Sequence, residues 1–548
     1  MSTVRLITLA AAGWLLGACA VNHVPVEYAE PPADTAAQQV MQVIDPLLRK
    51  GAIRQRPDWR EHVITADKRG KFEERMFHPD DPCRRAGGAG APTFGDCQVG
   101  RVLNALDKAI DAHFANGAKT PFRLLLSIHG GLVGETAAVE QAKAHLPLMR
   151  ADGVYPVFLN WHTGGVNSYG DQVVFVRNGE RIDNAGGFAR AAHVAATPLH
   201  VATDIAEGLV RAPVQWASQL ADLESDVEEG DPAPGSLYDG AAWGAISGAK
   251  NLLSAPGNVS TGELASERLH YFLTSPFKIA TMPLVDGIGK PAWDNMLRRS
   301  RAVLRTDDDF RDAPARCQLM SGINRACYDR GSGAFARFLG HLERLVAYHR
   351  RKHAAAVPAG RAGYGGCAPI GISLVAHSMG AIVANDILRD FDLGVCNIVF
   401  MAAASSIRHF YNTTLPYIER HPGVRFYNMM LHPTNDQRED YAWGLVPEGS
   451  LLVWIDSFYE ESDSVFDRTL GKWQNVGRTK RMFSARAQRC MFFKVFGIKG
   501  AFPTGHGAFN DVWFESAAND GPIAYAYNYW QPRFWGHPDL GGADTACR

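Results

Sequence analysis

The sequence predicts an α/β protein built on a doubly wound, mostly parallel sheet. Short apolar runs rich in branched residues recur along the chain, and such runs are typical of strands buried on both faces. Segments with helical periodicity separate these runs, and an order of strand, helix and strand favours parallel pairing. The expected strands lie between residues 122 and 498 and have the sequences FRLLLSI, YPVFLNW, PIGISLVAH, CNIVFMAAA, VRFYNMML and CMFFKVFGI.

Three segments, one before the first expected strand and two between strands, carry the helical pattern most clearly. Apolar residues recur at helical spacing over 102–114, and Asn116-Gly117 follows as a stop signal. A second helix is expected over 136–150, with Thr136 as its N-cap. A third is amphipathic over 335–346 and runs on into a basic end.

The chain is long enough for a large domain that carries an insertion. It has 548 residues, of which 46% are hydrophobic, so it can bury a large core. The alternation of strands and helices is lost after residue 161 and returns near residue 333. The interrupting stretch is interpreted as a mainly helical cap, with a separate domain as the alternative. The expected segments are a signal peptide at 1–18, a tether at 19–60, the first part of the core at 61–162, the cap at 163–330 and the second part of the core at 331–548.

The N-terminus has the order of features of an export signal. Arg5 precedes the apolar run Leu6–Leu16, which is too short to span a bilayer, and two small residues precede Cys19 in LLGAC. This pattern resembles the lipobox of bacterial lipoproteins, and an ordinary secretory signal is the alternative. The resemblance implies cleavage before Cys19, acylation of its sulfur by chains such as palmitate, and a lipid anchor in the bacterial cell envelope. Ala20 after the cysteine favours the outer membrane, facing the periplasm or the surface.

Cysteine usage is consistent with export. The chain has nine cysteines, and nine less Cys19 leaves eight, an even number that suits a set of disulfide bonds in an oxidising compartment. The spacings are poor for zinc, because no CxxC pair occurs. Short spacing suggests the pairs Cys83–Cys97 and Cys317–Cys327, and position before neighbouring strands suggests Cys367–Cys396. Cys490 and Cys547 are then left as a pair, although the sequence does not fix the connectivity.

Charge gives no indication of a nucleic-acid partner. The formal net charge is −1, and no basic stripe with interleaved aromatic residues is present. The basic run at 298–305 is interpreted as a solvated helix face rather than a surface for anionic headgroups. His349 and His353 lie four residues apart, as helical metal ligands can. We expect them not to bind metal, because they lie among Arg and Lys at a helix C-terminus, where positive charge suits the helix dipole.

The pentapeptide Ala376-His377-Ser378-Met379-Gly380 joins an expected strand to an expected helix. Small residues two before and two after the serine let the strand and the helix approach closely around a strained turn. Such a turn lifts the hydroxyl out of the sheet and aims the helix N-terminus at it, where backbone N–H groups can stabilise negative charge. Ser378 is therefore the candidate nucleophile, and Met379 is a candidate oxyanion donor.

Three further parts of a catalytic site follow in the order that such a nucleophile requires. The sequence HGG at 129–131 ends a strand upstream, and its loop offers the N–H of Gly131 or Leu132 as a second oxyanion donor. A carboxylate is expected after a later strand, where Asp436 is preferred and Glu439 and Asp440 are alternatives. The base is expected last, and His506 lies between glycines in the final loop, where it fits better than His432 or His537.

Together these residues resemble the α/β-hydrolase superfamily of serine esterases and lipases. The resemblance covers about 120–161 and 333–515, with the cap between them, and it departs from the commonest pattern at Ala376, where glycine is usual. It implies that His506 deprotonates Ser378, that Asp436 orients His506, and that an acyl-enzyme forms without a metal or organic cofactor. The membrane anchor and the insertion favour lipid or other acyl esters as substrates. Acyl transfer, amide hydrolysis and a non-catalytic envelope lipoprotein with this fold are the alternatives.

Overall fold

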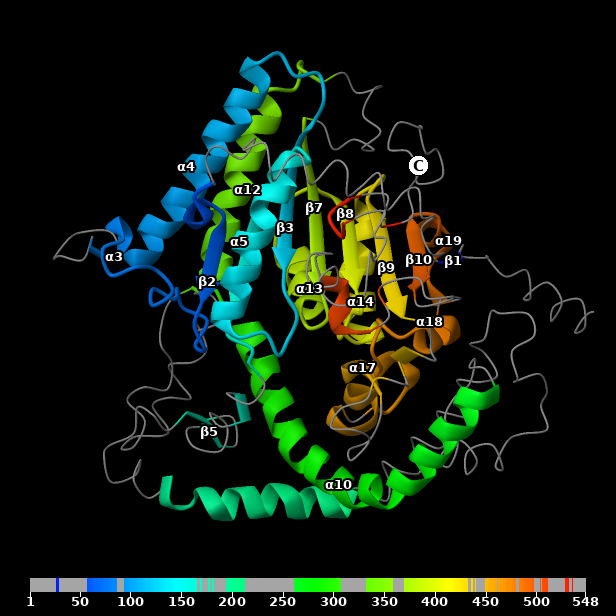
Figure 1. Ribbon diagram of the computed structural model, residues 1–548. Helices are drawn as coiled ribbons and strands as arrows, with labels where there is room; N and C mark the ends of the chain where they lie inside the picture. The colour runs from blue at the N-terminus through cyan, green and yellow to red at the C-terminus, as the bar shows by residue number, and fades with distance from the viewer. Residues whose placement is uncertain are drawn as a thin grey trace, which may run out of the picture.

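The computed structural model confirms the α/β class and the parallel sheet. All six expected strands belong to this sheet (Figure 1). The structure describes residues 26–28, 57–85, 93–164, 168–169, 176–177, 180–181, 194–211, 261–306, 332–357, 369–431, 435–436, 439, 449–460, 462–479, 482–496, 503, 505–510, 528–531 and 535, with the backbone alone at 26–28, 176–177, 180–181, 261–280, 478 and 510.

The main sheet has eight strands in the order β1-β10-β9-β8-β7-β3-β4-β2, and all of its pairings are parallel. Its strands are β1 (Val26–Tyr28), β2 (Val63–Ala66), β3 (Phe122–Ile128), β4 (Val154–Trp161), β7 (Ile370–His377), β8 (Val395–Met401), β9 (Arg425–Leu431) and β10 (Met491–Phe496). A separate antiparallel pair consists of β5 (Val176–Arg177) and β6 (Glu180–Arg181).

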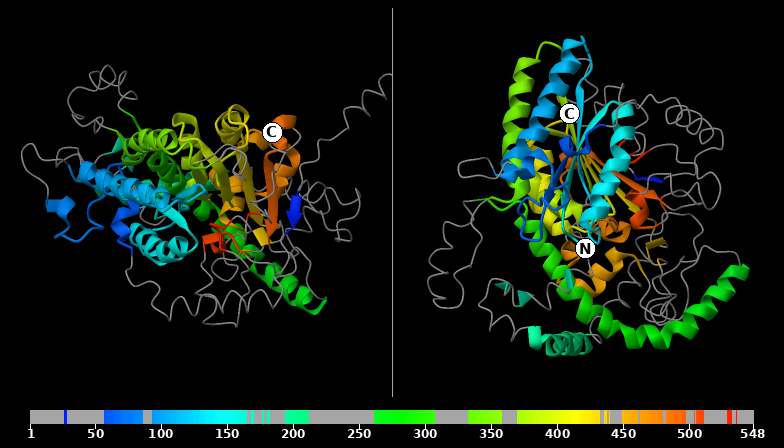
Figure 2. Two further views of the ribbon diagram at one scale, coloured as in Figure 1. Left: turned by 90° about the horizontal axis from the view of Figure 1, so that it is seen from above. Right: turned by 60° about the vertical axis from the view of Figure 1, so that its left-hand side comes forward.

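The winding of the sheet reverses between β3 and β7. The chain leaves β3 through α5 (Glu135–Ala151) towards β4, and it leaves β7 through α13 (Gly380–Asp390) in the opposite direction, towards β8. Because parallel crossovers are right-handed, these two helices lie on opposite faces of the sheet, as the view from above in Figure 2 shows. Ligands of doubly wound sheets bind at such a reversal, outside the carboxyl ends of the strands.

The other helices surround this sheet. A capping box between Thr93 and Asp96 starts α4 (Phe94–Ala115) at Phe94, eight residues before the predicted helical pattern begins at residue 102. The helix α5 begins at Glu135 after Gly134, so Thr136 lies inside its first turn and is not its N-cap as predicted. The remaining elements are α3 (Pro82–Arg85), α10 (Thr261–Ala302), α12 (Ala334–Lys352), α14 (Ile407–Asn412), α15 (Thr414–Arg420), α17 (Leu451–Trp454), α18 (Trp473–Thr479), α19 (Ala485–Gln488) and the short helical turns η1 (Trp59–Glu61), η3 (Ile455–Tyr459), η4 (Val465–Asp467) and η7 (Gly507–Asn510).

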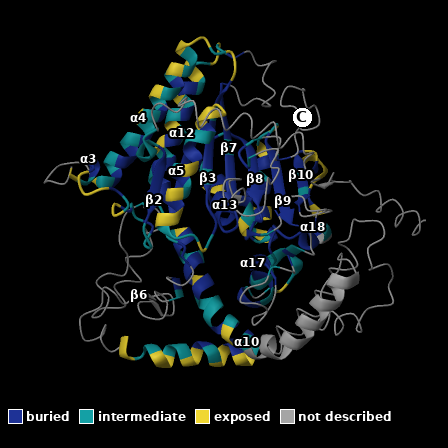
Figure 3. Cartoon of the chain, viewed as in Figure 1, coloured by how far each residue is buried: buried dark blue, intermediate teal, exposed yellow. Residues whose placement is uncertain are grey.

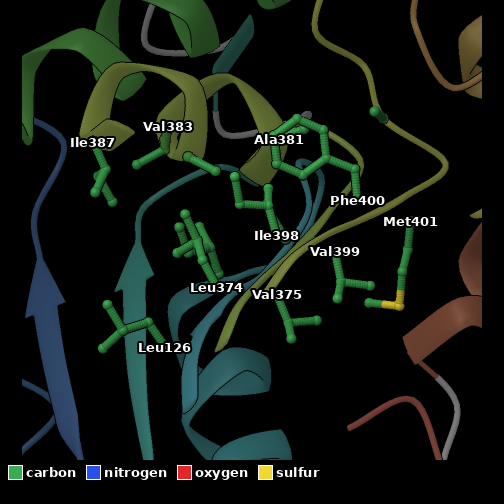
Figure 4. Close-up of a cluster of buried hydrophobic side chains, with 14 of the residues drawn as sticks. Leu126, Leu374, Val375, Ala381, Val383, Ile387, Ile398, Val399, Phe400 and Met401 are labelled. Atoms are coloured by element: carbon green, nitrogen blue, oxygen red, sulfur yellow. The ribbon is translucent and has the colours of Figure 1, made fainter. Parts of the chain in front are cut away.

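The part of the core that positions the turn lies between the central strands and α13. Side chains of β3, β7 and β8, such as Leu126, Leu374 and Ile398, pack with Val383 and Ile387 of the helix (Figure 4). Each fully buried aliphatic side chain contributes roughly 1.5–3 kcal/mol through removal from water. Figure 3 shows the central strands of the main sheet mostly buried, whereas α4, α5 and α12 expose their outer faces. The position of the turn between β7 and α13 is therefore fixed by a rigid core.

The expected insertion is described in part. Residues 197–211 are helical, and α10 runs beneath the carboxyl ends of the strands (Figure 1). The helix at 197–211 and α10 cross so closely that only glycine fits at position 287. A Cβ added there would lie 2.5 Å from the Asp204 carbonyl oxygen. The basic run 298–305 is only partly the solvated face that the sequence predicted: Arg301 is exposed, whereas Arg299 is buried and donates to Ser168 Oγ at 2.8 Å. An apolar environment accepts a guanidinium only with such partners.

The predicted Cys83–Cys97 disulfide bond is present. Cys396 and Cys490 are also disulfide-bonded. Their predicted partners lie outside the described residues, as do the pair Cys317–Cys327, the signal peptide and Cys19. Within the part of the chain that the structure describes, no helix is both long enough and apolar enough to cross a bilayer.

Candidate active site

Ser378 occupies a strained turn at the carboxyl end of β7. Its φ angle is +50°, in the left-handed region that costs a non-glycine residue on the order of 1–3 kcal/mol. Hydrogen bonds fix this conformation from both sides: the Ser378 N–H donates to the Met401 carbonyl at 2.8 Å, and the Ser378 carbonyl accepts from the Ala404 N–H at 3.0 Å. Backbone strain that neighbouring hydrogen bonds maintain in this way is characteristic of functional residues.

The glycines around the serine are required by close packing. A Cβ on Gly380 would lie 2.6 Å from the carbonyl oxygen of Ile128, at the end of β3. A Cβ on Gly130 would lie 2.7 Å from His377 Nδ1 and 3.0 Å from Ser378 Cβ. Two loops that are far apart in the sequence therefore touch at the point where the sheet reverses.

His506 provides a base for this serine. Its Nε2 lies 2.8 Å from Ser378 Oγ, and both side chains are buried. Burial lowers the pKa of His506 well below its usual value, because desolvation disfavours the charged ring and His377 lies nearby. The imidazole is therefore neutral at neutral pH, and it can accept the serine proton.

Two neighbours hold the His506 loop, and sequence reasoning missed one of them. Burial lowers the pKa of His377 to about 4, so its neutral ring donates through Nε2 to the His506 carbonyl at 2.9 Å. The Oε1 of Glu439 accepts the His506 backbone N–H at 3.1 Å. His377 stands directly before the nucleophile, and that position is the only sequence signal that could have identified it.

The structure does not bring Asp436 into hydrogen-bond contact with His506. Asp436 is buried beside Ser450 and Lys472, and burial raises the pKa of its carboxyl group to about 7. The His506 Nδ1 has no hydrogen-bond partner among the described residues. Glu439 is thus the candidate acid with a described contact to the His506 loop, and Asp440 lies outside the described residues.

One of the two predicted loop donors is already engaged. The N–H of Leu132 donates to the Thr163 carbonyl at 3.1 Å, so it is not available to a substrate in this arrangement. Gly131 lies beside Met379, the other predicted donor: a Cβ added to Gly131 would lie 3.3 Å from the Met379 Cβ. Met379 directly precedes α13, where N–H groups at a helix start lack intrahelical partners.

His129 holds the loop that carries Gly131. Burial lowers the pKa of His129 to about 4, so its ring is neutral. The Nε2 of His129 accepts the Trp161 N–H at 3.1 Å, which places the ring proton on Nδ1. That Nδ1 donates to the Gly130 carbonyl at 2.7 Å and orients the peptide before Gly131.

A hollow of about 1100 Å³ lies next to the turn. Ile382 and Ala404 line it on the side of the serine, and Trp293 and Leu297 of α10 line it opposite. Arg298 and Arg301 also border it, and neither Ser378 nor His506 is among its lining residues. The hollow therefore adjoins the serine site without containing the reacting groups.

Comparison of the chain with models of protein families, with curated proteins and with solved structures finds no match. The geometry of the described residues is therefore the basis for the functional assignment.

Proposed function

We propose that this protein is a serine hydrolase of the α/β-hydrolase type that cleaves carboxylic esters. The observation that carries the proposal is the 2.8 Å separation between Ser378 Oγ and the Nε2 of the buried His506. The two residues meet where the winding of the sheet reverses, and α10 passes over the same edge as part of the proposed cap.

In the proposed mechanism, His506 removes the Ser378 proton as the hydroxyl oxygen attacks the ester carbonyl. The N–H groups of Met379 and Gly131 stabilise the tetrahedral oxyanion, and one such donor contributes about 3–4 kcal/mol. His506 then protonates the leaving alcohol, and water hydrolyses the acyl-enzyme with His506 again as the base. The contact with the His506 loop favours Glu439 over Asp436 as the supporting carboxylate.

The proposed substrates are lipid or other acyl esters. The hollow beside the serine combines apolar groups with four arginines and four carboxylates, a combination that suits an acyl chain attached to a polar group. The lipobox-like sequence ending at Cys19 supports a location at a membrane, where such esters are abundant.

Labelling with a fluorophosphonate probe tests the assignment of the nucleophile. The probe reacts with a serine only where a base activates it, so we expect labelling of the native chain and none of Ser378→Ala. Ser373→Ala is a matched control, because this serine lies five residues earlier in β7 and should leave labelling unchanged. Absence of labelling in a well-folded sample of the native chain would instead favour a non-catalytic scaffold. A panel of acyl esters of increasing length, phospholipids included, assayed with and without an alcohol or amine acceptor, then separates hydrolysis from acyl transfer.

Replacement of Cys19 by alanine tests the proposed anchor. We expect Cys19→Ala to move the protein from the membrane fraction to the soluble fraction, because a multiply acylated cysteine holds through many methylenes at roughly 0.8 kcal/mol each. Cell fractionation and metabolic labelling with palmitate provide the measurement, with the native chain as the reference. Persistent membrane partitioning of Cys19→Ala would rule out the lipobox interpretation.

A further inference from the structure

A cluster of two histidines and two aspartates lies between α4 and α12, far from Ser378. The helices run side by side, and their C-terminal ends lie on the side of the sheet opposite to α10 (Figures 1 and 2). Asp107 and Asp111 are one turn apart on α4, and His349 and His353 are one turn apart at the end of α12. Residues four apart share a helix face, so both pairs point into the same seam. We call these four residues the seam cluster.

A hydrogen bond to Asp107 places a proton on Nε2 of His349. Its Nε2 lies 2.7 Å from Asp107 Oδ1, and a carboxylate can only accept, so Nε2 carries the proton. The His349 ring is fully buried, and its Nδ1 has no hydrogen-bond partner among the described residues. This nitrogen lies 3.6 Å from Asp111 Oδ1. In the neutral ring a lone pair thus faces a carboxylate oxygen, an arrangement that a cation between the two atoms would satisfy.

His353 completes the set of donor atoms. Its Nε2 lies 3.2 Å from the same Asp111 oxygen, and one donor atom each from Asp111, His349 and His353 lie within 4.8 Å of one another. Zinc binds nitrogen and oxygen at about 2.0–2.2 Å, which places two ligands of a tetrahedral ion roughly 3.3–3.5 Å apart. The separations of Asp111 Oδ1 from His349 Nδ1 and from His353 Nε2 lie close to that value.

The surroundings of the seam cluster also suit a cation. Both helices end here, and the C-terminus of a helix carries a partial negative charge. Asp107 accepts from the far nitrogen of His349, and metal-bound histidines commonly have such a carboxylate behind them. The exposed Lys352 competes for this place, since its Nζ lies 2.7 Å and 2.8 Å from the two oxygens of Asp111.

We propose that Asp111, His349 and His353 bind a divalent transition-metal ion such as Zn²⁺, with Asp107 as the supporting carboxylate. This proposal reverses the sequence-based expectation that the two histidines are not ligands. That expectation considered only the basic neighbours on α12, whereas the acidic face of α4 reaches the site through the fold. Binding requires Lys352 to turn into solvent, and the ion then joins α4 to α12 as a structural link. Three protein ligands leave a fourth position for water.

Isothermal titration of the tag-free, full-length chain with ZnCl₂ tests the proposal. We expect the native chain to bind zinc at one site. The affinity should fall at least about 100-fold in His349→Ala, His353→Ala and Asp111→Asn. It should fall about 10–100-fold in Asp107→Asn, as for other supporting carboxylates. Zinc should raise the Tm of the native chain and not that of the ligand variants. Co²⁺ should give the visible absorption of a tetrahedral site. His341→Ala is the matched control, since this exposed histidine lies two turns earlier on α12.

Lys352→Ala distinguishes a metal site from an ordinary network of ion pairs. If the seam cluster binds zinc, removal of the competing ammonium should tighten binding several-fold. The proposal would be overturned if neither the native chain nor Lys352→Ala bound zinc, or if binding survived in the double variant His349→Ala, His353→Ala. Circular dichroism of each variant without metal keeps loss of binding separate from loss of fold.

Discussion

Replacing His506 with alanine is expected to lower kcat/KM for the proposed ester hydrolysis by about 10⁴–10⁶, as loss of the base does in serine hydrolases. The Ser378 hydroxyl would then have no acceptor for its proton, since His506 Nε2 is the group 2.8 Å away. Steady-state kinetics on a chromogenic short-chain ester measures the loss. Ser378→Ala should lose a similar factor, and the double variant should lose no more than either single variant, because the two groups act as a unit.

The same His506 variant is expected to leave the Tm nearly unchanged. The described contacts that hold this loop use the backbone of residue 506: its carbonyl accepts from His377 and its N–H donates to Glu439. Alanine keeps both bonds. It also removes a buried Nδ1 that lacks a hydrogen-bond partner among the described residues. Differential scanning calorimetry provides the measurement. A large drop in Tm would identify His506 as a structural residue. So would a double variant in which the free-energy losses of the two single variants add.

The elements that the sequence predicts best are those whose pattern is local. The apolar run ending at His377 and the helical pattern after Gly380 predict both the strand β7 and the helix α13. The serine between them was expected in a strained turn, and its φ of +50° confirms this. Turn chemistry, strand periodicity and helix periodicity all act over a few residues, so they can be recognised without the fold.

Features that depend on tertiary contacts were beyond the sequence. The strand β2 has four residues, too few for a period to be recognised, and it forms because it pairs with β4. Leu132 was expected as a donor, but the position of Thr163, which engages its N–H, follows only from the fold. The seam cluster requires two helices that are more than two hundred residues apart in the chain. Side chains on separate elements meet only after the topology has placed those elements.

Comparison of Glu439→Gln with Asp436→Asn is expected to identify the acid. We expect Glu439→Gln to lower kcat/KM by about 10³–10⁴, in the range found for loss of the triad acid in serine proteases. Glu439 contacts the His506 loop, whereas Asp436 lies beside Lys472 and Ser450. With a pKa of about 7, Asp436 is only partly charged at neutral pH and is less suited to stabilise an imidazolium. Asp436→Asn should therefore lower kcat/KM by less than about tenfold. A larger loss in Asp436→Asn than in Glu439→Gln would identify Asp436 as the acid.

The Asp436 variant should also change how stability depends on pH. The folded-state pKa of about 7 lies above the ordinary value of 3.8, so between these values the folded chain binds this proton more tightly than the unfolded chain does. Unfolding then releases the proton, and the contribution of Asp436 to the free energy of unfolding falls as the pH rises from about 4 to about 7. Asparagine resembles the protonated acid and does not titrate. Asp436→Asn should therefore match the native chain near pH 4 and exceed it at pH 8 in denaturant titrations. A variant that is less stable than the native chain at pH 8 would show instead that the charged carboxylate stabilises the fold, through its neighbour Lys472.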